Sequence, residues 1–148
     1  MRVTLQRVLK ADVEINKYNT RSIGEGILIL IGIGSADNKK IIERMGDKIL
    51  NLRLFNDSQT KMNYSILDIK GEILIISQFT LYGDCNKGNR PSFIKAALPK
   101  HANKIYNEFV NYIKNKCDLK VETGEFGANM KVSLINNGPV TFNLEIEA

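Results

Sequence analysis

Hydrophobic and polar residues alternate over the first six positions, where polar side chains separate Met1, Val3 and Leu5. A period of two predicts a strand that buries one face. Residues 23–33 are instead mostly Ile and Leu, with glycines near both ends. This pattern predicts a strand that is buried on both faces and bounded by turns. Shorter apolar segments predict further strands at 52–55, 73–77, 130–135 and 140–147.

Two segments repeat their apolar residues with the period of an α-helix. The first follows Asp37, a residue type that caps helix N-termini, and the second begins near Pro99, a favoured first-turn residue. Because the helices lie between strands, and about half of the strands follow one another like hairpins, we expect an α/β fold. It would contain a mixed sheet, or two stacked sheets, with the helices on one side. The two apolar stripes consist of Ile41, Ile42, Met45, Ile49 and Leu50, and of Ala102, Ile105, Tyr106, Phe109, Val110 and Ile113.

Polar segments rich in Asn, Asp, Gly or Lys separate these elements. They predict turns or loops at 56–63, 83–91 and 123–124, and a turn at 136–139 between the last two strands. The final strand alternates clearly, so its apolar positions are expected to point inward. These positions are Val140, Phe142, Leu144 and Ile146.

The length and composition predict one domain over residues 1–148, with enough apolar residues, 43%, to form a core without a disulfide or metal. Cys85 and Cys117 lie far apart, which excludes a disulfide framework and a zinc motif. The N-terminal residues lack the apolar run of a signal peptide, and the longest apolar stretch, 27–33, is too short to cross a bilayer. We therefore expect a reduced, cytoplasmic protein without a membrane partner.

A net charge of +5 suits a polyanionic partner such as nucleic acid. The 21 basic residues are mostly Lys, however, and A/T-rich coding also enriches Lys. The charge alone therefore leaves a nucleic-acid partner and a bias of codon usage as alternatives.

Catalytic side chains of the usual kinds are scarce. The single histidine, His101, lies in the first turn of the second predicted helix without an evident acid or nucleophile beside it. It is therefore interpreted as a solvated residue rather than a general base. A metal site would need carboxylates alone, and no calcium-binding loop is present. The glycines of the 23–33 segment do not form a phosphate-binding fingerprint. We predict neither a metal nor a cofactor.

Two short segments are better candidates for a site. Ser77–Thr80 directly follow a predicted buried strand, where backbone N–H groups and small hydroxyls can bind a carbonyl oxygen. A plain strand-to-loop transition is the simpler interpretation of the same residues. Asn136–Thr141 contain Gly138-Pro139, which is normally an ordinary turn, although X–Pro bonds also adopt the cis form. The residues alone do not separate main-chain recognition of a substrate from a hairpin turn.

Taken together, these segments resemble the D-aminoacyl-tRNA deacylases, also called D-tyrosyl-tRNA deacylases. The similarity covers essentially the whole chain, and it depends on the order and spacing of many short motifs. They are Gln6-Arg7-Val8, Gly26-Ile27-Leu28, Lys61-Met62-Asn63, Ser77-Gln78-Phe79-Thr80-Leu81, Gly88-Asn89-Arg90-Pro91-Ser92-Phe93, Gly124-Glu125-Phe126, Met130, Val132-Ser133-Leu134 and Asn136-Asn137-Gly138-Pro139-Val140-Thr141.

The resemblance implies hydrolysis of the ester that joins a D-amino acid to the terminal adenosine of tRNA. It also implies removal of glycine from tRNA for alanine, a three-layer α/β/β domain and a homodimer. In that dimer a cis Gly138-Pro139 element of one subunit enters the active site of the other. The residues carried over are Arg7, which holds this element; Ser77, Gln78, Phe79 and Thr80, which line the opposing catalytic side; and Phe126 and Met130, which flank the terminal adenine.

An aminoacyl ester is already activated, so the scarcity of catalytic side chains fits a site built largely from backbone. Backbone N–H groups near Phe79 and Thr80 would bind the carbonyl oxygen, and the neighbouring ribose hydroxyl would assist the attack. Thr80 as the nucleophile is the rival mechanism, and it lacks an evident base. A rigid Gly138-Pro139 wall would leave no room for an L side chain and would let glycine pass.

Two other classes of function remain open at this point. One is a nucleic-acid-binding module without catalysis, and the other is a generic α/β hydrolase with an unseen base. If tRNA is the partner, basic residues near the motifs that carry the resemblance are candidate contacts for its phosphates. They are Lys87, Arg90, Lys95, Lys100 and Lys104.

Overall fold

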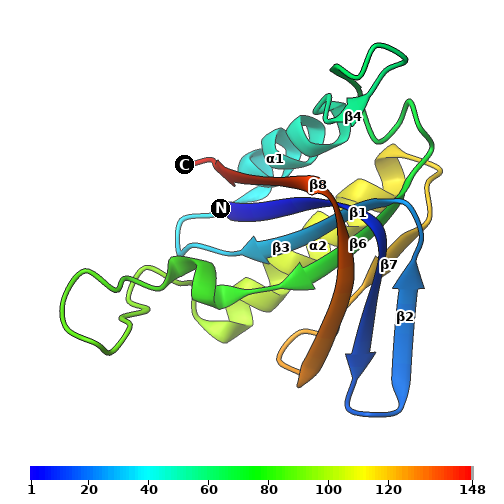
Figure 1. The fold of residues 1–148 in the computed structure, drawn as a ribbon. Coiled ribbons are helices and arrows are strands. Elements are labelled where there is room, and N and C mark those ends of the chain that lie inside the picture. The colour runs from blue at the N-terminus through cyan, green and yellow to red at the C-terminus, as the bar shows by residue number, and fades with distance from the viewer. Residues whose placement is uncertain (148) are drawn as a thin grey trace.

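A long, bent first strand organises the sheet. β1 (Arg2–Ile15) pairs antiparallel with β3 (Gly26–Gly32) along its first half and with β2 (Asn19–Ile23) along its second half. β8 (Met130–Glu145) follows the other side of β1 over its whole length. β6 (Glu72–Ser77) and β7 (Val121–Thr123) extend the sheet from β3 as parallel strands. The computed structural model describes residues 1–147, and Figure 1 shows this arrangement.

The helices cover one face of this sheet. α1 (Lys39–Asn51) follows β3, and α2 (Pro99–Lys116) precedes β7. A hairpin of β4 (Phe55–Asn56) and β5 (Met62–Tyr64) follows α1, and the 3-10 helix η1 (Phe79–Tyr82) follows β6. The buried residues of α1 and α2 include every member of the two predicted apolar stripes. Both predicted helices are therefore confirmed.

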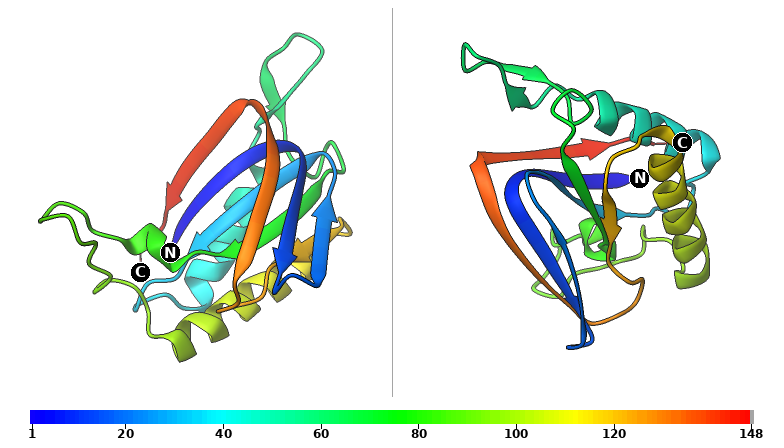
Figure 2. Two further views of the ribbon diagram at one scale, coloured as in Figure 1. Left: turned by 60° about the horizontal axis from the view of Figure 1, so that its bottom comes forward. Right: turned by 90° about the vertical axis from the view of Figure 1, so that its right-hand side faces the viewer.

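The central strands alternate their side chains between two cores. Ile27, Ile29 and Ile31 of β3 face the helices, whereas Leu28 faces the opposite side, and β6 alternates in the same way. The second core is closed by the second half of β1, by β2 and by the first half of β8, which bend back over the sheet (Figure 2). The layers are therefore helices on sheet on sheet. This confirms the predicted α/β fold with a mixed sheet and two main helices.

The first helix does not begin as predicted. Asn38, not Asp37, is its N-cap, and the Asn38 side chain accepts hydrogen bonds from two backbone N–H groups of the first turn, at 3.0 and 3.4 Å. Asp37 is buried instead, and its carboxylate accepts hydrogen bonds from the α-amino group of Met1 at 2.7 Å and from the N–H of Gly34 at 2.8 Å. A buried ammonium needs a paired carboxylate, and this pairing directs Asp37 away from the helix.

The hairpin turn predicted at 136–139 is also wrong. β8 runs through these residues without reversing, and both of its halves pair with β1. The pairing shifts between Gln6 and Val8, so that residues 137–140 stand opposite the single residue Arg7. Extra residues on one strand of a pair form a bulge. The Gly-Pro sequence is therefore a bulge in a continuous strand.

Four smaller findings complete the comparison with the sequence. Phe142 was expected to point inward, but it is 36% exposed, because the second half of β8 is an edge strand with only β1 beside it among residues 1–147. The strand predicted at 52–55 is reduced to β4, and a turn divides the segment 23–33 between β2 and β3. No helix of the described chain is long and apolar enough to cross a membrane.

Candidate functional site

The carboxyl ends of β3, β6 and β7 meet at one edge of the sheet, because these strands are parallel. β6 ends there at Ser77, and the N–H of Gln78 donates to the carbonyl oxygen of Ile31 at 2.8 Å. The side-chain amide of Gln78 donates a hydrogen bond to the hydroxyl of Thr80, and the ring of Phe79 is 58% exposed. These four consecutive residues therefore present a hydroxyl, an amide and an aromatic ring at one place.

The first two residues of η1 have backbone N–H groups without an intrahelical partner, as at the start of any helix. η1 is held by hydrogen bonds from the N–H of Leu81 to the carbonyl of Gln78 at 3.3 Å and from the N–H of Gly83 to the carbonyl of Thr80 at 2.9 Å. These bonds leave the N–H groups of Phe79 and Thr80 available to an oxygen that develops negative charge.

Tyr82 ends η1 and anchors it. Its side chain is buried, and burial raises the pKa of the phenol to about 12, so Tyr82 stays protonated near neutral pH and cannot act as a base. A Cβ on Gly34 would lie 2.6 Å from the Tyr82 Oη, so glycine makes room for this ring. The Arg2 guanidinium lies 4.7 Å from the ring centroid and donates to the Leu81 carbonyl at 3.2 Å. These roles could not be predicted from the sequence, because Arg2 occupies an ordinary polar position of the first strand.

Phe126 and Met130 lie beside the ends of β6 and β7. Gly124 follows β7 there and donates a backbone hydrogen bond of 2.9 Å to β6. The sulfur of the half-buried Met130 is the nearest atom, at 2.5 Å, to a Cβ built on Gly124. The ring of Phe126 is half-buried against Tyr106 of α2, with a centroid distance of 6.1 Å. The structure therefore brings Met130 to the edge that holds Ser77, and Phe126 to the adjoining surface of α2.

Arg7 lies beneath the bulge of β8 and is 7% exposed. Its Nε donates to the carbonyl oxygen of Asn137 at 2.9 Å, and its Nη1 donates to the carbonyl oxygen of Leu54 at 2.7 Å. The exposed Gly138–Pro139 peptide bond is cis. The φ of this glycine is +146°, and a Cβ on it would lie 2.6 Å from a methyl carbon of Val140. Both facts require glycine at this position.

The two groups of predicted site residues do not meet within one chain. Arg2 contacts η1 and Arg7 contacts the bulge, and five residues of extended strand separate these two arginines by about 17 Å. In Figure 1 η1 lies at one end of the sheet, near the N-terminus, and the bend of β8 lies at the other. A site that contains both Ser77–Thr80 and Gly138–Pro139 therefore needs two chains.

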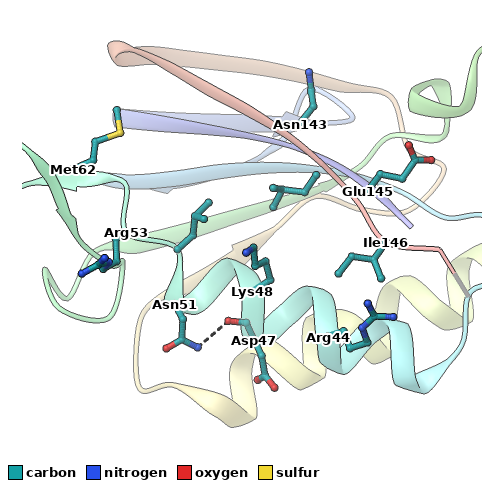
Figure 3. Close-up of a pocket in the computed structure, with 11 residues that line it drawn as sticks. Arg44, Asp47, Lys48, Asn51, Arg53, Met62, Asn143, Glu145 and Ile146 are labelled. Carbon is teal, nitrogen blue, oxygen red and sulfur yellow. Dashed lines mark hydrogen bonds between the residues drawn. The ribbon is translucent and has the colours of Figure 1, made fainter.

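Two surface hollows border the second half of β8. The larger, of about 1120 Å³, lies between α1 and β8, and none of Ser77–Thr80 lines it. Figure 3 shows Arg44 and Lys48 of α1 on one of its walls and Asn143 and Glu145 of β8 on the other. The smaller hollow, of about 240 Å³, adjoins η1, and it is the one next to the predicted catalytic residues. It is lined by Arg2, Val3, Thr4, Leu81, Asn143, Leu144 and Glu145.

His101 is half-buried, so the prediction of a solvated side chain is wrong. Its Nε2 lies 3.1 Å from the main-chain oxygen of Asp37, which makes the ring a structural contact at the start of α2. Among residues 1–147 no group of three or more His, Cys, Asp or Glu side chains is placed to hold a metal ion. The chemistry that the sheet edge offers is backbone N–H, hydroxyl and amide groups, which suit the binding of a carbonyl oxygen and a water molecule.

Known proteins share both the sequence and the fold of this chain. A model of the D-Tyr-tRNA(Tyr) deacylase family matches residues 4–145. The D-aminoacyl-tRNA deacylase of Thermosipho africanus is 56% identical over 145 residues, which cover 98% of this chain and 97% of that protein. A solved structure of a c-Myc DNA unwinding element binding protein is 40% identical, with a TM-score of 0.94 and 100% of each chain covered.

A second solved structure, described as a "probable eukaryotic D-amino acid tRNA deacylase", is only 18% identical. It nevertheless gives a TM-score of 0.85 over 98% of both chains, so the fold persists at low identity. The family model spans nearly the whole chain, and a relative of nearly the same length exceeds one half identity. The family predicted from the motifs is confirmed: this chain belongs to the D-Tyr-tRNA(Tyr) deacylase family.

Proposed function

We propose that this chain hydrolyses the ester bond of D-aminoacyl-tRNA and releases the D-amino acid and free tRNA. The observation that carries the proposal is the pair of available backbone N–H groups at Phe79 and Thr80. An aminoacyl ester is reactive by itself, so stabilising the oxyanion is the main task left to the protein. Family membership supports the same activity, and a tRNA substrate would place the enzyme in the cytoplasm.

In this mechanism water adds to the carbonyl carbon of the ester, and the carbonyl oxygen becomes an oxyanion held by the two N–H groups. The ribose oxygen then leaves and takes up the proton lost by the water, a transfer that the vicinal ribose hydroxyl assists. Thr80 is the poorer nucleophile, because its hydroxyl accepts a hydrogen bond from the amide of Gln78. An amide N–H cannot take up the proton of the threonine. Ser77 and Gln78 would position the water.

A substrate and a variant separate these two mechanisms. D-tyrosyl-tRNA that ends in 2′-deoxyadenosine should be hydrolysed slower by roughly a hundredfold, the lower range of general acid–base catalysis. Thr80→Ala should lower the rate by less than about tenfold, the loss of one supporting contact. If Thr80→Ala abolished hydrolysis while tRNA binding survived, Thr80 would be the nucleophile and the ribose-assisted mechanism would be wrong.

We also propose that Gly138–Pro139 of a second copy reads the chirality of the substrate. An exposed main-chain wall opposite η1 would hold the amino group and the Cα–H of a D residue and would collide with an L side chain. Glycine has no side chain, so glycine on tRNA for alanine would also be hydrolysed. Arg7 would hold this wall in place, and the half-buried Phe126 and Met130 would flank the terminal adenine.

The free edge of β8 supports a homodimer of this kind. The second half of β8 pairs only with β1 among the described residues, so its other side keeps unpaired backbone groups. This segment runs from the bulge to Glu145, whose carboxylate binds Arg2 at 2.6 Å beside η1. A two-fold axis beside the middle of the segment would therefore set the bulge of each chain against η1 of the other.

The activity is tested with D-tyrosyl-tRNA, L-tyrosyl-tRNA and glycyl-tRNA for alanine. We expect release of D-tyrosine and glycine and retention of L-tyrosine. The second candidate function is a nucleic-acid-binding module without catalysis, which the likeness to the c-Myc DNA unwinding element binding protein favours. Retention of all three amino acids by a protein that still binds tRNA would establish that alternative and exclude the deacylase.

The shared site is tested by co-expressing two variants that are inactive alone. Gly138→Val removes the donated element, and a Gln78→Ala/Phe79→Ala double variant removes the receiving side. Half of the dimers in an equal mixture contain one chain of each kind, and each of these has one intact site, so about a quarter of the wild-type activity should return. If the mixture stays inactive although mixed dimers form, the two segments act within the same chain.

A further inference from the structure

The positive charge of the chain is concentrated in one segment. Residues 83–104 contain five Lys or Arg residues and one acidic residue, whereas the other 126 residues contain sixteen basic and fifteen acidic ones. This segment, the basic segment, therefore carries +4 of the net charge of +5. A bias of codon usage would distribute Lys along the whole chain, and so it does not explain this concentration.

Most cations of the basic segment are unpaired. Lys104 forms an ion pair with Glu108 at 3.9 Å. The one acidic residue, Asp84, accepts hydrogen bonds from the backbone N–H and the side-chain amide of Asn86 at 2.9 and 2.8 Å. Exposed cations without a carboxylate partner keep their attraction for an external polyanion. Among residues 1–147 the cations of the segment without a carboxylate in ion-pair distance are Lys87, Arg90, Lys95 and Lys100.

The basic segment also exposes large apolar side chains. Ile94 is 91% exposed, Leu98 is 79% exposed and Phe93 is 36% exposed. The ring of Phe93 packs edge-on against Phe79, with a centroid distance of 5.0 Å, which joins the segment to η1. Cations interleaved with uncovered aromatic and aliphatic surfaces are typical of sites for single-stranded nucleic acid, where bases stack on side chains and cations follow the backbone.

Backbone hydrogen bonds fix the base of this segment beside η1. Asp84 and Ser92 exchange two of them, at 2.8 and 2.9 Å, which closes the loop between them. The N–H of Ala97 donates to the carbonyl of Ile33 at 2.9 Å and ties the other end to the chain after β3. The loop itself, green in Figures 1 and 2, projects from the body of the molecule beside η1. Nucleotides bound to it would therefore continue from a substrate held at η1.

We propose that the basic segment binds the unpaired nucleotides that precede the terminal adenosine of the tRNA. The ring of Phe93 stacks on one base, the side chain of Ile94 packs against the face of another, and the four unpaired cations neutralise phosphates. This inference rests on the proposed deacylase function. It assigns the nucleotides before the terminal adenosine to a surface that is separate from Ser77–Thr80. The site at η1 acts on the aminoacyl adenosine alone, and the basic segment supplies the preference for tRNA over a shorter ester.

The test compares D-tyrosyl-tRNA with D-tyrosyl-adenosine as substrates. For the tRNA, log kcat/KM falls with log salt concentration. Replacing Lys87, Arg90, Lys95 and Lys100 with Gln should make the slope of this line less negative by about 3, the contribution of four phosphate contacts. Phe93→Ala should lower kcat/KM on the tRNA by roughly tenfold, the loss of one stacked base. Ile94→Ala should lower it by roughly tenfold as well, the loss of apolar surface that is buried against a base. The Gln set and Ile94→Ala should leave kcat/KM on D-tyrosyl-adenosine unchanged, whereas Phe93→Ala also removes the packing on Phe79, so its loss on the tRNA should exceed its loss on the adenosine ester. The charge-matched control replaces Lys17, Lys40, Lys70 and Lys114 with Gln.

Equal losses on both substrates would overturn the proposal, because the segment would then only shape η1. Equal flattening by the control set would assign the salt dependence to overall charge, and a changed oligomeric state of Ile94→Ala would assign the apolar residues to a protein contact. Either result would also overturn it. If the wild type hydrolyses neither substrate, the proposed function itself fails. If the wild type hydrolyses both and the variants match it, only the role of the basic segment fails.

Discussion

The first half of β1 carries an arginine at each end, and the two arginines differ in what surrounds the charge. Arg7 is 7% exposed, and it binds only neutral oxygens, namely the carbonyls of Asn137 and Leu54 and one asparagine side chain. The side chain of Arg2 is 32% exposed, and it binds the carboxylate of Glu145. Of these two arginines, only the more exposed one has a charged partner, although a buried ion gains most from such a partner.

This difference shows what each arginine contributes. A guanidinium offers five N–H donors in a fixed plane, and at Arg7 these donors join the bulge of β8 to the chain around β4. A buried carbonyl that loses its donor costs about 1–3 kcal/mol, so this end of β1 tolerates little change. An exposed ion pair contributes only about 0–1 kcal/mol, so the ion pair of Arg2 with Glu145 holds its surroundings less firmly than the bonds of Arg7 do. The contact of Arg7 with the bulge that carries Gly138–Pro139 is therefore the firmer of the two arginine contacts.

Arg7→Ala should have the largest effect. We expect a loss of about 3 kcal/mol in the free energy of unfolding, because the buried Leu54 carbonyl and the part-buried Asn137 carbonyl lose a charged donor. Hydrolysis of D-tyrosyl-tRNA should fall as well, because the bulge loses its support. Urea unfolding followed by circular dichroism measures the first effect. Arg7→Lys is the control, since an ammonium keeps the charge but not the planar set of donors. Equal stability of Arg7→Lys and the wild type would show that charge matters here and geometry does not.

The two ends of β1 also differ in how well the sequence predicted them. The segment Ser77–Thr80 was predictable because it follows from local patterns. The apolar residues of β6 end at Ser77, and polar residues follow at once. The bulge was not predictable, because Asn136–Pro139 have the composition of a hairpin turn. Only the pairing of both halves of β8 with the same strand distinguishes a bulge from a turn.

Polar contacts between residues far apart in the chain could not be predicted from the sequence, for a related reason. Asp37 has the local signature of a helix cap, but its strongest partner, the α-amino group of Met1, lies 36 positions away. Arg2 and its partner Glu145 are 143 positions apart. Periodicity describes neighbours along the chain, so it can place a side chain on the polar face of a strand but cannot name the group that this side chain will meet.

Gly138→Ala should have the second largest effect, a loss of about 2 kcal/mol in the free energy of unfolding. The new alanine would need a φ of +146°, and its Cβ would lie 2.6 Å from a methyl carbon of Val140. Thermal unfolding measures the change. Gly127→Ala is a matched control, because Gly127 also has a positive φ, +76°, but nothing lies within 4 Å of its Cβ position. If both variants lose equal stability, crowding at the bulge contributes nothing.

The pH dependence of stability tests how much the buried phenol of Tyr82, rather than the ion pair of Arg2, stabilises the region around η1. Burial raises the pKa of Tyr82 from 10.0 to about 12. The unfolded chain therefore releases this proton first, and the stabilisation is complete below pH 10 and is lost as the pH rises from 10 to 12. At pH 11 the wild type should have lost about 1 kcal/mol more than Tyr82→Phe, relative to pH 8. Parallel curves for the two proteins between pH 8 and 11 would contradict this assignment.

Arg2→Ala should have the smallest effect, about 0.5 kcal/mol in the free energy of unfolding. Arg2 makes three contacts, to Glu145, to the Leu81 carbonyl and to the Tyr82 ring, so the single variant does not isolate the ion pair. A double-mutant cycle with Glu145→Gln does isolate it, and the coupling energy should be below about 1 kcal/mol and should shrink in 0.5 M salt. A coupling above about 2 kcal/mol that resists salt would mean that Arg2 is held as firmly as a buried group. The two arginine contacts at the ends of this half of β1 would then not differ in how firmly they are held.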